Sequence, residues 1–454
     1  MLEGASELPV VRFRTARIVW RTICCCASVP LLSRCRRMNI RSLTIKHSLF
    51  AALLFAFATC AQAAGTFAGA DDRAADIDWL ITQIETRYAY LPERHLDLAK
   101  MRALYEPEAR AAQTRDDFIH VVERVVAELH DDHVTLGTNT RSSPQLIPTG
   151  AELWAQMRGG RAVIVEVLPG SPAAKAGVAP GDVVLSVGGI AVDQAIERSK
   201  AKTLTAPDAE ALDFSLRRLL AGTHDAARRI EVKNAKGKVR VIELPPFVSP
   251  DNTELVTWRW LNARTGYIRI ENSLGDSDTV AAFDAALSAL SKATNLILDL
   301  RNTPSGGNTD IAEPIMGRFI SRTAEYQRIF EPAAGKRFPQ DSWAKTVAPR
   351  APQVTAKLIV LVNHWTGSMG EGMAIGFDAM NRAQIVGTPM ARLCGGTENF
   401  ELPKTGIPVH LPTYRLYHMN GTPREAFVPS IEVDLTRDRT AGDAILAGAL
   451  KTLD

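Results

Sequence analysis

The spacing of apolar residues predicts helices in the first part of the chain body. Apolar residues recur at intervals of three and four in residues 77–84 and again in 118–129, a period typical of amphipathic helices. Thr114, followed three residues later by Asp117, has the spacing of a capping box and should begin the second of these helices. We expect residues 71–142 to form a small helical N-terminal domain.

Residues 145–248 have a different pattern, with short apolar runs separated by glycine and proline. Residues 163–168 are expected to be a strand, 170–177 a turn with a short helix, and 180–189 a turn, a strand and a second turn. Residues 229–244 resemble a closing hairpin. This segment is therefore predicted to be a small β-rich domain.

From residue 250 to 454, apolar strands alternate with helices. Expected strands are 266–270, 295–301, 357–362 and 383–387, and expected helices are 277–290 and 368–380. Strands as apolar as these are typical of a parallel sheet buried on both faces, so we predict an α/β layered core. Residues 321–355 are polar and contain four prolines. We expect them to form a long connection without regular structure, and a loop of this length is usually functional or mobile.

Residues 38–63 have the three parts of a secretory signal peptide. Two basic residues precede an apolar stretch, 49–58, which is too short to span a bilayer, and Ala61-Gln-Ala63 has the small-x-small pattern of a cleavage site. We expect cleavage after Ala63 and a periplasmic or secreted protein, with a retained membrane anchor as the alternative. Residues 1–37 are interpreted as an over-extended start, with translation beginning at Met38.

Composition changes once the leader, residues 1–63, is removed. The leader carries nine Lys or Arg and two acidic residues, so residues 64–454 have 44 basic and 48 acidic residues. A slightly acidic body argues against nucleic-acid binding. Five of the six cysteines also lie in the leader, and Cys394 alone forms neither an intramolecular disulfide nor a cysteine-rich metal site. We expect no cofactor and no metal.

The most informative segment is residues 362–371, where a buried strand ends and Gly367 permits a sharp turn into a helix opened by Ser368. A helix N-terminus offers free N–H groups and positive potential to an oxyanion, so Ser368 is a candidate nucleophile. Alternatively, Ser368 only caps the helix, with Glu371 completing a capping box. Position 366 is Thr, so the segment is not the Gly-x-Ser-x-Gly elbow of α/β-hydrolases.

A second segment, residues 299–307, has the sequence Asp-Leu-Arg-Asn-Thr-Pro-Ser-Gly-Gly directly after a predicted buried strand. Its glycine pair could turn backbone N–H groups into a cleft. An ordinary strand-to-helix turn explains the same residues, so this segment alone does not decide between the two.

Together, the two segments resemble the C-terminal-processing (tail-specific) and tricorn-like serine peptidases, and residues 163–189 resemble the PDZ module that many members carry. The resemblance implies a multi-domain α/β protein with N-terminal helices, a PDZ-like domain at 145–248 and a ClpP/crotonase-like catalytic core at 250–454. It implies Ser368 as the nucleophile. It also implies an oxyanion hole formed by the N–H of Met369 and that of Gly306 or Gly307.

The general base cannot be the one used in the best-known branch of that family, in which a Lys lies 25 residues after the Ser. Here that position is Leu393. Arg392 cannot replace the Lys because a guanidinium does not deprotonate near neutral pH, and Lys404 lies too far along the chain. A histidine is the natural substitute, because its pKa lies near the working pH.

Resemblance to the tricorn-like branch implies that His133, just after the N-terminal helices, is the base. It also implies that Glu425, close before Pro429, orients this base and stabilises its imidazolium. The order His, Ser, Glu is another permutation of the general triad. His130 is the main competitor for the base. Less favoured candidates are His364, His410 and Glu432.

The predicted function is thus that of an exported serine endopeptidase hydrolysing peptides or unfolded protein tails through Ser368, His133 and Glu425. The PDZ-like domain could bind a substrate C-terminus by strand addition, with residues 155–161 as its carboxylate loop, or serve as a spacer that gates the cleft. Two alternatives stay open. One is a catalytically inactive peptide- or ligand-binding protein on the same scaffold, and the other is a different acyl hydrolase using the same serine.

Overall fold

The computed structural model describes residues 67–250, 253–437 and 442–453, which belong to one unit, Thr66–Asp454. The predicted signal peptide, its cleavage site and the start at Met38 lie outside the described residues. Within the described ranges, no helix is long and apolar enough to cross a membrane.

The N-terminal helices form where the apolar spacing predicts them: α2 (Ala70–Arg87), α3 (Leu91–Arg94), α4 (Leu98–Ala111) and α5 (Arg115–Ala127). Thr114 and Asp117 form the predicted capping box at the start of α5. The apolar faces of α2, α4 and α5 share one core with Leu402 and with Val409 and Leu411 of a long strand from the C-terminal region. The helices are therefore packed against strands of the C-terminal region rather than folded around a core of their own.

The PDZ-like segment is an antiparallel sheet in the order β2-β3-β4-β6-β7, with β5 added to β4. Its elements are β2 (Leu153–Arg158), β3 (Arg161–Val167), α6 (Pro172–Lys175), β4 (Val183–Val187), β5 (Ile190–Ala191), α7 (Val192–Ser199), α8 (Ala209–Ala221), β6 (Arg228–Lys233) and β7 (Val239–Leu244).

The expected carboxylate loop at residues 155–161 is wrong. These residues form strand β2, a tight turn and the start of β3, because Gly159 and Gly160 both have positive φ (55° and 74°) and so close a two-residue hairpin.

The core sheet has the order β17-β14-β13-β10-β9-β8 and is parallel except for the edge strand β8. Its strands are β8 (Val256–Trp260), β9 (Thr265–Ile270), β10 (Asn295–Asp299), β13 (Lys357–Val362), β14 (Ala383–Gly387) and β17 (Ile431–Glu432). Its helices are α9 (Asp278–Ala289), α10 (Thr309–Gly317), α11 (Met369–Ala379) and α12 (Ala444–Lys451).

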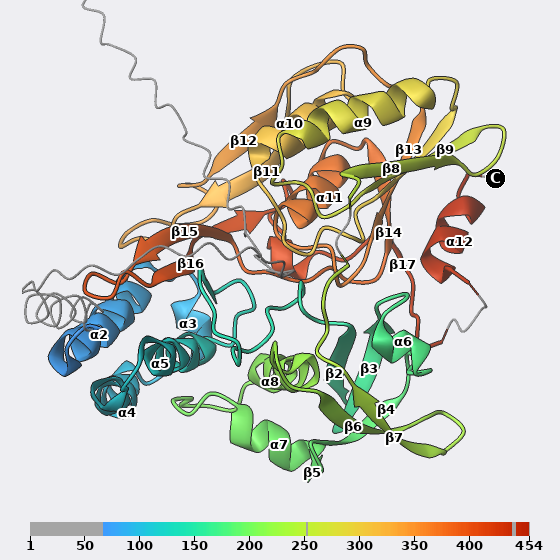
Figure 1. The fold of residues 1–454 in the computed structure, drawn as a ribbon. Helices are drawn as coiled ribbons and strands as arrows, with labels where there is room; N and C mark the ends of the chain where they lie inside the picture. Colours follow the sequence, from blue (N-terminus) through green and yellow to red (C-terminus); the bar gives the residue numbers. More distant parts are fainter. Residues whose placement is uncertain (1–66, 251–252, 438–441, 454) are drawn as a thin grey trace, which may run out of the picture. The chain divides into compact units, whose positions relative to one another are not determined.

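Alternate residues of β13 enter two separate cores, which confirms the layered α/β prediction. Leu358, Val360 and Val362 pack with α9, α10 and α11 on one face. Ile359 and Leu361 pack with α12 on the other (Figure 1).

A second sheet of the same region has the strand order β1-β16-β11-β12, with β15 paired to β16. Its strands are β1 (Thr135–Leu136), β11 (Ala324–Phe330), β12 (Trp343–Val347), β15 (Gly396–Glu401) and β16 (Pro408–Tyr417). The prediction that residues 321–355 lack regular structure is therefore wrong. A register shift between Glu325 and Gln327 interrupts the period-two pattern that would have revealed β11.

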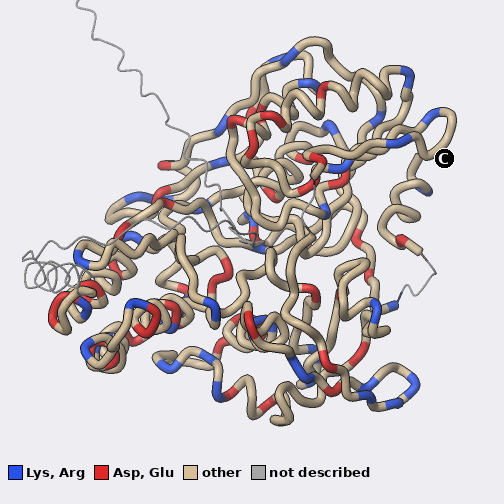
Figure 2. Tube along the Cα trace, in the orientation of Figure 1, with Lys and Arg blue, Asp and Glu red and all other residues tan. Residues whose placement is uncertain are grey.

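Charged residues of both signs are interspersed along the described chain (Figure 2). This distribution agrees with the nearly balanced, slightly acidic composition.

Candidate active site

Ser368 lies at a strained turn between β13 and α11. Its φ of 47° and ψ of −108° are uncommon for a residue with a side chain. The turn is held from two sides. The Ser368 N–H donates to Glu371 Oε2 at 2.8 Å, and the Gly367 N–H donates to the Thr303 carbonyl at 3.2 Å. The strain leaves the Ser368 hydroxyl half-buried at the carboxyl end of the sheet.

His133 faces this hydroxyl, with Nε2 3.2 Å from Ser368 Oγ. The two residues are 235 positions apart and meet because β1, directly after His133, pairs with β16 of the C-terminal region. The second ring nitrogen, Nδ1, lies 2.6 Å from the Cys394 carbonyl oxygen. A carbonyl only accepts, so Nδ1 carries the proton, and the lone pair of Nε2 is directed at the serine.

The surroundings of His133 keep its imidazole neutral. Burial, and after it the Arg424 guanidinium, lower its pKa to about 4, against the opposing effects of the Cys394 carbonyl and the Asp131 carboxylate. The Asp131 carboxylate also accepts the backbone N–H of His133 at 2.9 Å, which fixes the loop. At neutral pH the ring is therefore ready to accept a proton.

Glu425 does not occupy the expected position against His133. Among the described side chains its contact is with Tyr90, whose hydroxyl lies 3.5 Å from Oε2. The Cys394 carbonyl takes the place at Nδ1 that a triad carboxylate would fill. Burial raises the pKa of Glu425. The structure therefore shows no direct hydrogen bond between the described side chains of Glu425 and His133, and the role of Glu425 in orienting His133 and stabilising its imidazolium stays a prediction.

The predicted oxyanion hole is changed at one of its glycines. The Gly306 N–H donates to the Thr303 carbonyl at 3.1 Å, so it is not free for an oxyanion. Among the turn, loop and cap hydrogen bonds of the described residues, the N–H groups of Gly307 and Met369 donate to no backbone carbonyl. Met369 is the first residue of α11, where an N–H has no partner within the helix.

Gly306 contributes by its missing side chain. A Cβ at this position would lie 2.4 Å from Ser368 Cβ and 3.2 Å from the Met369 nitrogen. Its φ of 69° also favours glycine. Gly306 thus keeps the space in front of the serine and the Met369 N–H open.

The competing histidines have other partners. His130 Nε2 lies 3.0 Å from Asp208, the residue that caps α8. His364 Nδ1 lies 2.6 Å from Glu166 of the PDZ-like sheet. His410 is paired with Thr135 across β1 and β16.

The other sequence candidates are also accounted for. Leu393 is buried and packs in one apolar cluster with Trp154 of β2 and with Trp365, so the position of the family Lys is apolar. Lys404 lies 3.9 Å from Asp72 at the surface, and Glu432 belongs to strand β17.

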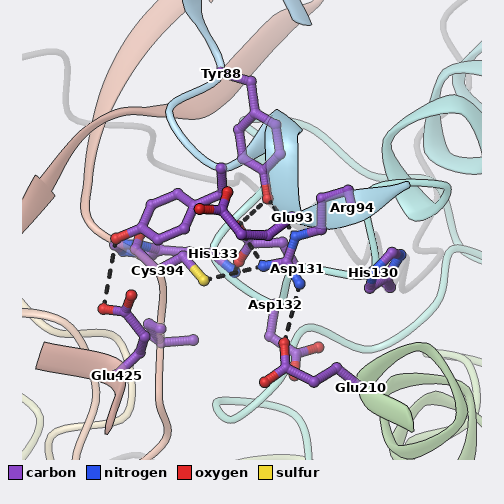
Figure 3. A network of polar contacts seen from close by, with 12 residues as sticks. Tyr88, Glu93, Arg94, His130, Asp131, Asp132, His133, Glu210, Cys394 and Glu425 are labelled. Atoms are coloured by element: carbon purple, nitrogen blue, oxygen red, sulfur yellow. Dashed lines mark hydrogen bonds and ion pairs between the residues drawn. The ribbon is translucent and has the colours of Figure 1, made fainter. Parts of the chain in front are cut away.

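A network of buried polar groups next to His133 was not expected from the sequence. Asp131 accepts from the Tyr88 hydroxyl at 2.7 Å, and Arg94 donates to that same hydroxyl and to the Cys394 sulfur at 3.0 and 3.1 Å (Figure 3). Asp131 stands two residues before His133, and this acidic residue close to the candidate base was the sequence signal that could have indicated the network. A cavity of about 500 Å³ adjoins this network and is lined in part by Tyr90, Cys394 and Glu425.

Comparison with protein families gives two matches. Residues 264–433 match peptidase family S41, and residues 163–202 match the PDZ domain. The HhoB protein of Synechocystis sp., named as a candidate serine protease, is 39% identical over 83 residues. That match covers 17% of this chain and 20% of HhoB, so the chain spans about a fifth of the length of this curated relative.

Solved structures with a similar fold include mature CPAF, with 16% identity, a TM-score of 0.56, and coverage of 85% of this chain and 96% of CPAF. The photosystem II D1 C-terminal processing protease has 19% identity, a TM-score of 0.53, and coverage of 84% and 97%. At these identities, the likeness describes the fold.

Proposed function

We propose that this chain, whose residues 264–433 belong to peptidase family S41, is an exported serine endopeptidase that cleaves peptides or unfolded polypeptide tails with Ser368 as nucleophile and His133 as base. The family match confirms the resemblance to C-terminal-processing serine peptidases. The observation that carries the assignment of roles is the 3.2 Å approach of His133 Nε2 to Ser368 Oγ with Nδ1 held by a carbonyl.

The reaction follows from this geometry. Ser368 Oγ bonds to the scissile carbonyl carbon while its proton passes to His133 Nε2, and the carbonyl π electrons move to the oxygen. The N–H groups of Met369 and Gly307 are the proposed donors to that oxyanion. His133 then gives the proton to the leaving amine, and the acyl-serine ester is hydrolysed by a water that His133 deprotonates in turn.

The PDZ match supports a substrate-binding role for residues 163–202. β2 is an edge strand of this sheet, and an edge strand can take an added peptide strand. We further propose that the PDZ-like domain recognises the free C-terminus of the substrate. The protein is exported through its predicted signal peptide, and Glu425 contributes electrostatically to the site.

Hydrolysis of an unfolded protein such as casein tests the proposal. Ser368→Ala and His133→Ala should each abolish hydrolysis to a similar degree, because groups that act as a unit do not contribute additively. Matched controls are Ser288→Ala on α9 and His224→Ala at an exposed position, which should keep wild-type rates. Full activity of Ser368→Ala would refute Ser368 as the nucleophile, whereas a wild type that hydrolyses no substrate would favour the binding protein on the same scaffold.

A further inference from the structure

The acceptor that orients His133 belongs to a loop without regular secondary structure. Residues 388–395 connect β14 to β15, and Arg392 and Gly395 within them have positive φ (62° and 48°). A backbone carbonyl in such a loop orients an imidazole only if other groups fix it. The contacts around the Cys394 carbonyl therefore determine how well His133 is positioned.

Arg424 holds the carbonyl side of this loop. Its Nη2 donates to the carbonyls of Leu393 and Gly395 at 2.9 and 2.6 Å, which flank Cys394, and its Nη1 donates to the Ser368 carbonyl at 3.2 Å. The side chain is buried. One guanidinium thus contacts both the loop that orients the base and the residue that carries the nucleophile.

Glu371 holds the N–H side of the same two segments. Its carboxylate accepts from the N–H groups of Ser368, Arg392 and Leu393 at 2.8, 2.9 and 3.3 Å. It is fully buried, and its Oε2 lies 4.0 Å from Arg424 Nη2. Burial raises its pKa to about 7, and Arg424 and the backbone hydrogen bonds oppose this shift.

We propose that Glu371 and Arg424 are a buried positioning pair that fixes the Cys394 carbonyl relative to Ser368, so that a backbone carbonyl orients the catalytic imidazole where a triad would use a carboxylate. This inference rests on the proposed function. A buried ion pair is weak evidence for a stabilising role, whereas contacts to both catalytic segments are what positioning requires.

Variants of Arg424 separate geometry from charge. Arg424→Lys keeps the positive charge but loses the planar fork that reaches three carbonyls at once. Arg424→Met removes the charge as well. The matched control is Arg228→Lys, which alters a similarly buried Arg–Glu pair, with Glu152, in the PDZ-like sheet.

Two readouts are measured on these variants. The first is the rate at which a fluorophosphonate acylates Ser368. The second is the NMR titration of the His133 ring in a Ser368→Ala background, which needs no activity. The charged or titratable groups that act on His133 are Arg424, Asp131 and His410.

We expect Arg424→Lys to slow labelling by about 100-fold. Arg424→Lys should also lower the titration midpoint of His133, because the Cys394 hydrogen bond that raises its pKa is weakened while the positive charge stays. Arg424→Met should slow labelling as much. Arg228→Lys should change neither. A purely structural role would not move the midpoint in folded Arg424→Lys, which keeps the charge.

Labelling of Arg424→Lys at the wild-type rate, or an unchanged titration midpoint of His133 in that variant, overturns the inference. If both Arg424 variants fail to fold, the near-isosteric Glu371→Gln replaces them and must slow labelling by at least about 10-fold, because an amide NH₂ then faces backbone N–H donors. An unlabelled wild-type protein would instead count against the proposed function, and the titration still tests the pair.

Discussion

The pH dependence of the reaction tests the state of His133 in depth. Its pKa is lowered to about 4, first by burial and then by the Arg424 guanidinium. At pH 5.5, a histidine with an ordinary pKa of about 6.5 would be about one-tenth neutral, whereas one at about 4 would be almost entirely neutral. Since only the neutral ring accepts the serine proton, the acid limb of activity should be centred near pH 4.

The assay is kcat/KM for a short peptide between pH 3.5 and 8, because this ratio reports the free enzyme. We expect near-maximal activity at pH 5.5, falling only towards pH 4. The free energy of unfolding should change with pH in the same direction as the activity. The folded pKa lies below the unfolded one, so the unfolded chain binds more protons and stability decreases as the pH falls from about 6.5 to 4.

Circular dichroism at each pH separates loss of fold from titration of the base. An acid limb centred near pH 6.5 in a protein that is still folded would refute the reasoning. His133 would then be exposed to water during the reaction, or another group would be the base.

Other predictions follow from single contacts. Gly306→Ala should reduce kcat by about 100-fold, since its Cβ would crowd Ser368 and block an oxyanion donor. Gly335→Ala, at a similar positive φ in open space, should leave kcat unchanged. Glu425→Gln should reduce kcat less than His133→Ala does, because the Glu425 side chain contacts Tyr90 rather than His133. Equal losses of kcat would instead support a strict Ser-His-Glu triad. A peptide with a free C-terminus should compete with substrate better than its amide. If the predicted signal peptide is cleaved after Ala63, N-terminal sequencing of the mature protein should give Ala64, and a longer N-terminus contradicts the predicted cleavage.

The regular elements of the core were readable from the sequence because they follow from local periodicity. Strands β10 and β13 contain continuous apolar runs, and α11 begins where Gly367 and Ser368 predict a turn. Strand β11 was missed because a bulge shifts its alternation and its partner β16 lies far along the chain.

Part of the site was also readable. Ser368 and His133 were singled out by the turn and by the family resemblance, and the structure brings them together. The acceptor at Nδ1 could not be predicted, because a backbone carbonyl has no residue-type signature. Glu425 was favoured as the orienting group because it resembles the late triad Glu of the tricorn-like branch, and no residue in the sequence indicated that a carbonyl accepts from Nδ1 instead.

The most direct test of the central claim is mass-spectrometric mapping of the fluorophosphonate adduct at neutral pH. The account predicts one adduct, on Ser368, formed rapidly in the wild type and at least about 1000-fold more slowly in His133→Ala. An adduct on a different serine, or an equal rate without the imidazole, would contradict the claim that His133 activates Ser368.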